Sequence, residues 1–487
     1  MSAFDEIRNS RIEKLNTLKK EGINPFPAKT NRDFTLKEVV EKFDELLKKD
    51  SVCLAGRIMA IRGQGALIFF NLNDGTGEFQ GLLKKDEMEA GQFNLFVSTI
   101  DVGDFVEISG KLFVTQRGQK TLQVKTWRIL TKSLRPLPDK WDGLQDEEER
   151  LRKRYLDIMF NPEVRDMVAK RSVFWQATRE FLLNKGFMEV ETPVLENTTG
   201  GAEARPFITQ HNALDLPVYL RISPELWLKK IMVSGFPKVF EIGRDFRNEG
   251  MDAEHLQDYT MMECYEAYSD YEKGMAFVEE MYKFVINKTF GTLKFKIKTF
   301  EIDLGQKWEV YDYRETIKKM TGLDINKADL EEVEMKLKEL KVVYERGDFF
   351  NLPRAFDNLW KYCRRQIPGP GFLINVPVMM EPLAKRMEKN PNLVERFQII
   401  LAGSEMGKGF SELNDPIDQL GRFEEQEKMR ESGDDEAQMK DDTFVEALEY
   451  GMPPTFGFGF SERLFSFLMN KPARDCQIFP LLRPKKD

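Results

Sequence analysis

The sequence predicts an α+β protein in which a small N-terminal β-barrel precedes a larger domain built from strands and helices. Three observations support this fold class. Residues 51–132 contain five short β-rich runs separated by turn signals. Residues 134–140 form a proline-rich linker that cannot lie inside a helix. Residues 143–487 alternate helical and strand patterns, and a chain of 487 residues is too long for one typical core.

The composition indicates which broad class of protein this is. Hydrophobic residues make up 41% and charged residues 32%, which is typical of globular proteins. No run approaches the roughly 20 apolar residues of a membrane span, and the N-terminus lacks the apolar core of a signal peptide. We therefore expect no membrane partner and a cytoplasmic location. The net charge of −8 gives no support for nucleic-acid binding, although it does not forbid it.

The scarce residue types exclude several kinds of site. The four cysteines are far apart in sequence, so no CxxC zinc site is predicted. Only two histidines are present, His211 and His255, which excludes a catalytic centre built on several imidazoles. If the protein is an enzyme, its chemistry rests on Arg, Lys, Glu and Asp, with or without a hard metal ion.

Residues 1–50 are expected to form a helical segment. Ile12, Leu15 and Leu18 make a narrow apolar stripe, which favours a helix packed on its own domain. The alternative is an RNA-contacting face formed by Lys14, Lys19 and Lys20.

Residues 51–135 are expected to form a small barrel such as the OB-fold, because five strands fall within about 80 residues. The expected strands are Val52–Ile61, Ala66–Leu72, Gly77–Leu83, Asp104–Phe113 and Thr121–Leu130. Alternation places Phe69 and Phe70 on opposite faces. One ring would then be core and the other free to stack on an unpaired base. The alternative is that both rings are core.

Residues 136–160 are interpreted as a hinge, and residues 161–487 as the larger domain. Asn161 and Pro162 suit a helix start, with Asn as the cap. Gly186 ends this helix, and Phe187–Val190 follows as a strand. Residues 314–365 are predicted to be a charged helical insertion, and the acidic stretch 423–442 a solvated helix or loop.

Residues 238–268 predict an antiparallel hairpin with a long polar loop. On its return strand five alternate residues share one face, namely Tyr259, Met261, Glu263, Tyr265 and Ala267. A carboxylate on such a face is unexpected in a plain core, because buried carboxylates are rare unless paired. The hairpin is therefore a candidate site; the alternative is a solvent-facing side of an edge strand.

Two further segments carry candidate chemistry. Residues 403–415 contain Glu405 and Glu412, whose carboxylates suit hard cations such as Mg²⁺. Residues 456–464 form a glycine-containing strand that runs into a helix, with Arg463 near the helix start, a suitable place for an anion. The alternative for the second segment is an ordinary helix cap with a surface arginine.

Together these segments resemble class II lysyl-tRNA synthetases. Residues 186–195 resemble motif 1, residues 246–250 with 260–263 resemble motif 2, and residues 456–464 resemble motif 3. The lysine-specific branch is marked by residues 200–208, 211–214, 221–225 and 409–415. The resemblance covers nearly the whole chain.

The resemblance implies an OB-fold anticodon domain before a catalytic domain made of an antiparallel sheet flanked by helices. It implies a homodimer joined through motif 1, with ATP, Mg²⁺, L-lysine and tRNA(Lys) as ligands. In the implied reaction the lysine carboxylate attacks the α-phosphate to give lysyl-adenylate. A tRNA 3′ hydroxyl then takes the lysine.

The resemblance also implies roles for individual residues. The catalytic residues would be Arg247 and Arg463. ATP would be bound by Arg247, Glu249, His255, Tyr259, Glu405 and Arg463. The substrate lysine would be bound by Gly201, Glu225, Arg247, Glu263, Tyr265, Phe410 and Glu412. Mg²⁺ would be carried by Glu405 and Glu412, and the anticodon read by Phe69 and Gln80. A cluster of carboxylates around one cation would select lysine, since other side chains leave those charges uncompensated.

The chain departs from the family pattern in four places. These are Glu254, Lys408, the motif 3 run Phe458–Arg463, and Thr121. Lys408 is expected to replace the positive charge that position 254 lacks. The alternative is that both side chains point to water.

Three rival functions are considered. An aspartate or asparagine synthetase shares the architecture, but an acidic substrate would need a basic pocket. An enzyme that adenylates lysine to modify a protein typically lacks an anticodon domain. An RNA-binding protein with a decayed catalytic domain would not be expected to retain Arg247, Glu249, Glu405, Glu412 and Arg463.

Overall fold

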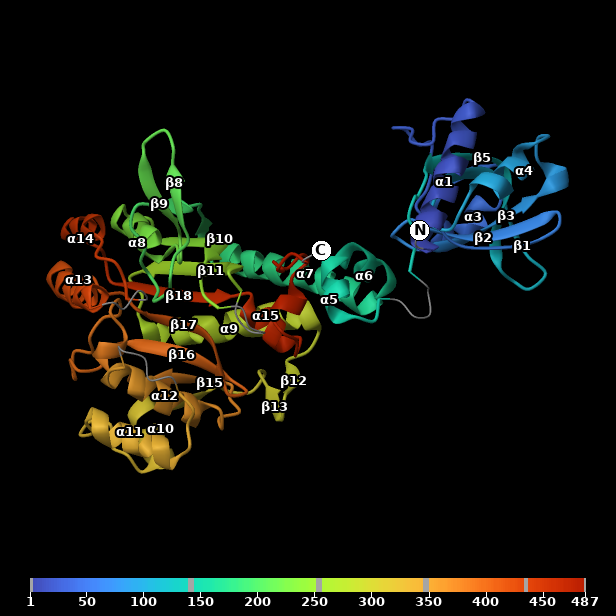
Figure 1. Ribbon diagram of the computed structural model, residues 1–487. Coiled ribbons are helices and arrows are strands. Elements are labelled where there is room, and N and C mark those ends of the chain that lie inside the picture. Colours follow the sequence, from blue (N-terminus) through green and yellow to red (C-terminus); the bar gives the residue numbers. More distant parts are fainter. Residues whose placement is uncertain (1–2, 139–143, 251–255, 345–349, 433–436, 486–487) are drawn as a thin grey trace. The chain divides into compact units, whose positions relative to one another are not determined.

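The computed structural model describes residues 3–138, 144–250, 256–344, 350–432 and 437–485 (Figure 1). The chain divides into two compact units, Met1–Gln145 and Asp146–Asp487. Each unit has its own hydrophobic core. The division falls just after the predicted proline-rich linker.

The first unit contains a closed five-stranded barrel in the order β1-β2-β3-β5-β4, which confirms the predicted OB-fold. Its strands are β1 (Val52–Gln64), β2 (Leu67–Asn73), β3 (Glu78–Lys84), β4 (Phe105–Val114) and β5 (Lys120–Thr131). Phe70 is 1% exposed inside the barrel, whereas Phe69 is half-buried. The two rings thus lie on opposite faces of β2, as alternation predicts. The other short elements are α2 (Leu36–Glu41), α3 (Phe43–Leu46), η1 (Lys85–Glu87) and α4 (Gln92–Thr99).

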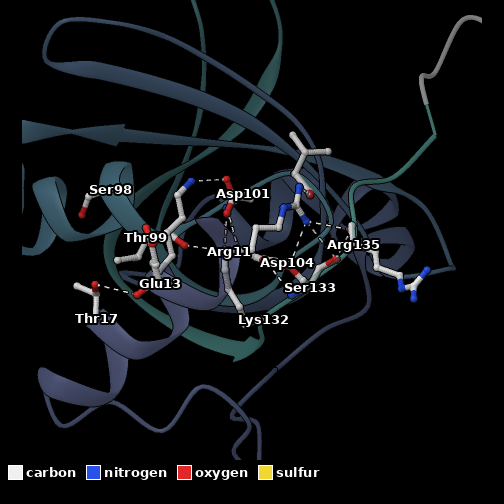
Figure 2. A network of polar contacts seen from close by, with 12 residues as sticks. Arg11, Glu13, Thr17, Ser98, Thr99, Asp101, Asp104, Lys132, Ser133 and Arg135 are labelled. Carbon is white, nitrogen blue, oxygen red and sulfur yellow. Dashed lines mark hydrogen bonds and ion pairs between the residues drawn. The ribbon is translucent and has the colours of Figure 1, made fainter. Parts of the chain in front are cut away.

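Helix α1 (Ala3–Lys20) packs on its own unit, as predicted, with Leu15 and Leu18 buried. Arg11 donates hydrogen bonds to the carbonyl oxygens of Val102 at 3.0 Å and Arg135 at 3.0 Å (Figure 2). The fully buried Lys132 lies in the same network, where its Nζ is 2.6 Å from Asp101 and 2.7 Å from Asp104. These bonds fasten α1 to the end of the barrel.

The second unit is built on an eight-stranded sheet in the order β14-β15-β16-β17-β18-β11-β10-β6. Its strands are β6 (Met188–Glu189), β10 (Lys238–Phe246), β11 (Asp258–Ala267), β14 (Glu309–Asp312), β15 (Gly371–Ile374), β16 (Arg396–Leu401), β17 (Ser404–Ser411) and β18 (Thr455–Ser461). The predicted hairpin is present, because β10 and β11 pair antiparallel. Strand β11 lies between β10 and β18 inside the sheet, so the edge-strand alternative is wrong.

Helices α7 (Pro162–Asn184) and α9 (Tyr271–Phe290) pack together along this sheet (Figure 1). The other helices are α5 (Glu147–Arg152), α6 (Arg154–Phe160), α8 (Glu225–Val233), α10 (Tyr313–Thr321), α11 (Leu330–Glu339), α12 (Leu352–Arg364), α13 (Pro416–Glu431), α14 (Asp442–Glu449), α15 (Arg463–Leu468), η2 (Val378–Met380) and η3 (Arg474–Cys476). Two small sheets complete the unit, formed by β7 (Leu195–Glu196), β8 (Ile208–His211) and β9 (Leu216–Leu220), and by β12 (Lys294–Ile297) and β13 (Phe300–Asp303).

Several local predictions can be compared directly with these elements. Helix α7 begins at Pro162, but the Asn161 side chain does not cap it; this amide donates to Asp157 instead. The expected insertion is helical over α10, α11 and α12. The acidic stretch 423–442 is not simply solvated, because Phe423 on α13 is completely buried.

All four cysteines are free and buried, with Cys53 in the barrel and Cys264, Cys363 and Cys476 in the second unit. Burial raises the pKa of the Cys363 and Cys476 thiols to about 12. Among the helices that the structure describes, none is long and apolar enough to cross a membrane.

Candidate active site

Strand β11 presents its polar face to a cavity of about 450 Å³ in the second unit. The walls come from β11, β17, β18 and α8, and from the loop before α8. All of the residues predicted to bind lysine or metal meet here, namely Gly201, Glu225, Arg247, Glu263, Tyr265, Glu405, Phe410 and Glu412. Segments spread over more than 200 residues of sequence therefore converge on one site.

Glu263 lies at the floor of this cavity and is 3% exposed. Its two carboxylate oxygens accept hydrogen bonds from the hydroxyls of Ser223 and Tyr265, each at 2.8 Å. Burial and the nearby charges of Glu225 and Asp245 raise the pKa of Glu263 to about 8. Glu263 is therefore buried, and both of its side-chain oxygens are held by hydrogen bonds.

Glu225 and Glu412 form a second acidic group, and a lysine of the protein lies behind it. Lys229 Nζ is 2.6 Å from Glu225 and 2.5 Å from Glu412, and its side chain is fully buried. Lys229 stands one helical turn after Glu225 on α8. The prediction from sequence missed this residue, although the four-residue spacing of Glu and Lys on a helix is a recognisable pairing signal.

Two glycines leave room for these carboxylates. Gly201 has φ of +84°, and a Cβ there would lie 2.8 Å from Glu225 Cβ. On β18, a Cβ at Gly457 would lie 2.0 Å from Glu412 Oε1 and 2.6 Å from the Tyr265 ring. Larger residues at either position would push into the acidic groups.

A second, smaller cavity of about 200 Å³ is lined by Arg247, Glu249, Tyr259 and Arg463. Arg247 also lines the larger cavity, so its guanidinium lies at the junction of the two. Its Cζ is 5.4 Å from the centre of the Tyr259 ring. The predicted ATP residues Glu249, Tyr259 and Arg463 therefore lie together beside the acidic cavity. His255 and Glu254 fall outside the described residues.

The predicted metal residues Glu405 and Glu412 lie near the two ends of β17, and both line the larger cavity. Glu412 is paired with Lys229, whereas Glu405 accepts a 2.8 Å hydrogen bond from Trp360 Nε1 and faces the cavity. Within the described ranges no cluster of three His, Cys, Asp or Glu is arranged for a metal.

Lys408 does not point freely to water, so that alternative is wrong for this residue. Its Nζ lies 3.1 Å from both carboxylate oxygens of the buried Glu381, at the edge of the larger cavity. Arg396 also contacts Glu381 at 3.0 Å. Burial acts to raise the pKa of Glu381, but the attraction of Lys408 and Arg396 outweighs it and lowers the pKa overall.

In the altered motif 3, the side chain of Glu462 is buried and connects neighbouring elements of the fold. This side chain is 3% exposed, forms an ion pair with Arg171 on α7, and accepts a hydrogen bond from the Thr260 backbone at 3.2 Å. It joins α7 to β11 directly before Arg463, which is the first residue of α15.

The two predicted anticodon residues lie in the first unit. Asn71 on β2 and Gln80 on β3 face each other in register, two residues along β2 from Phe69. The Gln80 side-chain oxygen accepts a 2.8 Å hydrogen bond from Thr121 Oγ1 on β5. Thr121, one of the four departures, therefore orients the Gln80 amide.

Comparison with known proteins agrees with both units. Residues 52–130 match the model of an OB-fold nucleic acid binding domain. Residues 146–483 match the family of tRNA synthetases class II (D, K and N). The chain belongs to this class II tRNA synthetase family.

The relatives specify which branch the chain resembles. It is 42% identical to the lysine--tRNA ligase of Thermotoga maritima over 99% of this chain and 97% of the relative. It is 43% identical to that of Carboxydothermus hydrogenoformans over 99% of both chains, and 43% identical to that of Halalkalibacterium halodurans over 98% and 96%. The resemblance to class II lysyl-tRNA synthetases is confirmed.

Proposed function

We propose that this protein activates L-lysine with ATP and transfers it to tRNA(Lys). The observation that carries the proposal is the buried acidic group of Glu225, Glu263 and Glu412 in one cavity, directly beside Arg247. Buried carboxylates of this kind favour a cationic amino acid and reject an acidic or apolar one. They argue against aspartate and asparagine as substrates.

Each end of the substrate lysine has a matching group. The α-amine is proposed to meet Glu263 and the backbone at Gly201. The ε-ammonium is proposed to lie among Glu225, Tyr265 and Glu412, with Phe410 beside its aliphatic chain. The carboxylate would then point towards Arg247, which lies where the two cavities meet.

ATP is proposed to occupy the smaller cavity. Tyr259 would stack on the adenine, Glu249 would bind its exocyclic amine, and Arg463 would hold the γ-phosphate. The lysine carboxylate attacks the α-phosphorus, a new C–O–P linkage forms, and pyrophosphate leaves. Arg247 neutralises charge on the carboxylate and the α-phosphate, so catalysis rests on positioning and electrostatics rather than on a covalent nucleophile.

Mg²⁺ is proposed to accompany ATP. Its preferred partners are carboxylate and phosphate oxygens, and Glu405 is a carboxylate that faces the cavity. When bound, the ion would neutralise the triphosphate. Because Glu412 is already ion-paired with Lys229, we assign only Glu405 to this role.

The barrel is proposed to read the anticodon through Phe69 and Gln80. The half-buried Phe69 ring would stack on a base. Since the oxygen of the Gln80 amide is held by Thr121, its NH₂ group would remain to donate to a base edge.

A homodimer through motif 1 and a cytoplasmic location are also proposed. Motif 1 and strand β8 carry several exposed apolar side chains in the second unit, among them Leu195 at 50% and Ile208 at 68% exposed. Covering such residues with a second copy would remove apolar surface from water.

The direct test is ATP–pyrophosphate exchange with the purified protein. Exchange should depend on lysine and be absent with aspartate or asparagine, and charging of tRNA(Lys) should follow. Exchange that is independent of lysine, or supported by an acidic amino acid, would refute the proposal.

A further inference from the structure

The acidic group of the larger cavity already contains one ammonium group of the protein. Lys229 Nζ contacts Glu225 at 2.6 Å and Glu412 at 2.5 Å, and lies 5.2 Å from the Phe410 ring. Its side chain is fully buried, whereas both carboxylate residues also line the cavity. Lys229 therefore pairs with both carboxylates, and the two residues that carry them also line the space for substrate.

Within the described ranges, the two carboxylates of Glu225 and Glu412 lack one hydrogen-bond donor. Glu412 Oε1 accepts no hydrogen bond from any residue that the structure describes, although its side chain is 0% exposed. Glu263 is a separate case, since Ser223 and Tyr265 already bond to its two oxygens. A buried oxygen without a partner is costly and indicates the place of a missing donor.

We propose that Lys229 is a specificity-determining residue of the lysine pocket: it supplies one of the two ammonium groups that Glu225 and Glu412 need, so that the substrate must supply one more. This inference rests on the proposed function. In the complex, the carboxylates of Glu225 and Glu412 would be balanced by the ammonium groups of Lys229 and of the substrate. A substrate with a neutral side chain would leave Glu412 without its second partner.

Burial and pairing shift the pKa values of both partners. Burial, followed by the charge of Glu225, raises the pKa of Glu412 well above its usual range despite the opposing effect of Lys229. Glu225 and Glu412 together outweigh the effect of burial on Lys229 and raise its pKa.

The balance of carboxylates and ammonium groups predicts that a second substitution should partly restore lysine binding. Glu412→Gln leaves one carboxylate for two ammonium groups, so the KM for lysine should rise about thirty-fold or more. Adding Lys229→Met removes the surplus ammonium and restores one carboxylate for one ammonium. The KM for lysine should then fall again by about tenfold, while the KM for ATP stays within twofold throughout. Methionine suits this site because it packs well against Phe410 and Phe444.

The matched control is Lys230→Met in the same Glu412→Gln background. Lys230 is the next residue on α8, but it bonds to Asp441 and Thr443 instead of the acidic group. This control should leave the KM for lysine within twofold of Glu412→Gln alone. Thermal melting with and without lysine gives a second readout, and Lys229→Gln replaces the methionine variant if that protein does not fold.

The outcomes separate the two proposals. A parent enzyme that shows no lysine-dependent exchange refutes the proposed function. The role of Lys229 alone is refuted if the parent uses lysine but Glu412→Gln leaves its KM unchanged. It is also refuted if adding Lys229→Met to the Glu412→Gln variant raises the KM for lysine further. Further loss is what a purely structural role would produce.

Discussion

At the scale of single residues, the site is governed by where charge is buried. Glu225, Glu263 and Glu412 are each less than 9% exposed. Glu225 and Glu412 share Lys229 as their partner, whereas Glu263 accepts hydrogen bonds from Ser223 and Tyr265. Removing one partner from such a group leaves the other buried and uncompensated. The cost exceeds that of the same change at the surface.

Glu225→Gln tests this at the lysine side chain. The variant should raise the KM for lysine with little change in the KM for ATP, because losing one charged partner in a desolvated site costs ~2–5 kcal/mol. Pyrophosphate exchange at varied lysine and ATP measures both constants. Glu266→Gln on β11 is the control, since Glu266 pairs with Lys238 at 2.8 Å and does not line the cavity. An unchanged KM and kcat for lysine in Glu225→Gln would show that the residue is wrongly assigned.

Lys408→Asn tests whether Lys408 compensates for the acidic residue at position 254. The change leaves buried Glu381 with Arg396 as its remaining cation. If Lys408 serves the substrates, the KM for ATP or lysine should rise clearly, and adding Glu254→Arg should recover part of the loss. Steady-state exchange kinetics of the single and double variants measure this. A Lys408→Asn enzyme as active as the parent would contradict the idea.

At the scale of elements, features that depend on local sequence patterns were predicted, whereas most of those that depend on long-range contacts were not. The five barrel strands and the hairpin of β10 and β11 were predictable, because alternation and turn residues are local signals. The common face of Tyr259, Met261, Glu263 and Tyr265 followed from the same alternation. The anchoring role of Glu462 and the burial of Phe423 were missed, since each depends on an element distant in sequence. Lys229 was also missed, although its spacing from Glu225 is a local signal.

Gly457→Ala tests the close approach of β18 to the acidic group. The added methyl group would lie 2.0 Å from Glu412 Oε1 and 2.6 Å from Tyr265, so one of these residues must move. Lysine-dependent exchange should fall at least about tenfold, as expected when a small displacement disturbs a positioned site. Gly421→Ala on α13 is the control, because no atom lies within 4 Å of its new Cβ. This control should keep full activity and gain stability, since Ala is favoured over Gly in a helix.

Phe69→Ala tests the exposed face of β2. Because a base–aromatic stack is worth ~1–3 kcal/mol, tRNA charging should fall by about five- to a hundred-fold. Lysyl-adenylate formation should remain intact, since Phe69 lies in the other unit. Equal losses in both steps, or a drop in melting temperature large enough to explain the charging defect, would favour a core role for the ring.

At the scale of the whole molecule, the two units each have their own hydrophobic core, and we assign a different function to each. The barrel unit carries the proposed RNA contacts, and the second unit contains both cavities. The exposed apolar residues of motif 1 belong to the second unit alone. Assembly of copies is therefore expected to depend on the second unit.

Leu195→Glu tests the proposed homodimer. A charge in the middle of an apolar contact should shift the mass measured by light scattering from dimer towards monomer. Ile417→Glu is the matched control, because Ile417 is 82% exposed at the start of α13, outside motif 1. A parent that is monomeric at micromolar concentration, or a Leu195→Glu protein that stays dimeric, would contradict this assembly.

The four buried cysteines make it possible to measure how often each unit opens, by the rate at which their thiols are labelled. Every thiol is buried, one in the barrel and three in the second unit, so a labelling reagent can react only when the surrounding unit opens. A label on Cys53 would record opening of the barrel, and labels on Cys264, Cys363 or Cys476 would record opening of the other unit. Timed labelling could therefore show which unit a bound tRNA or amino acid holds closed.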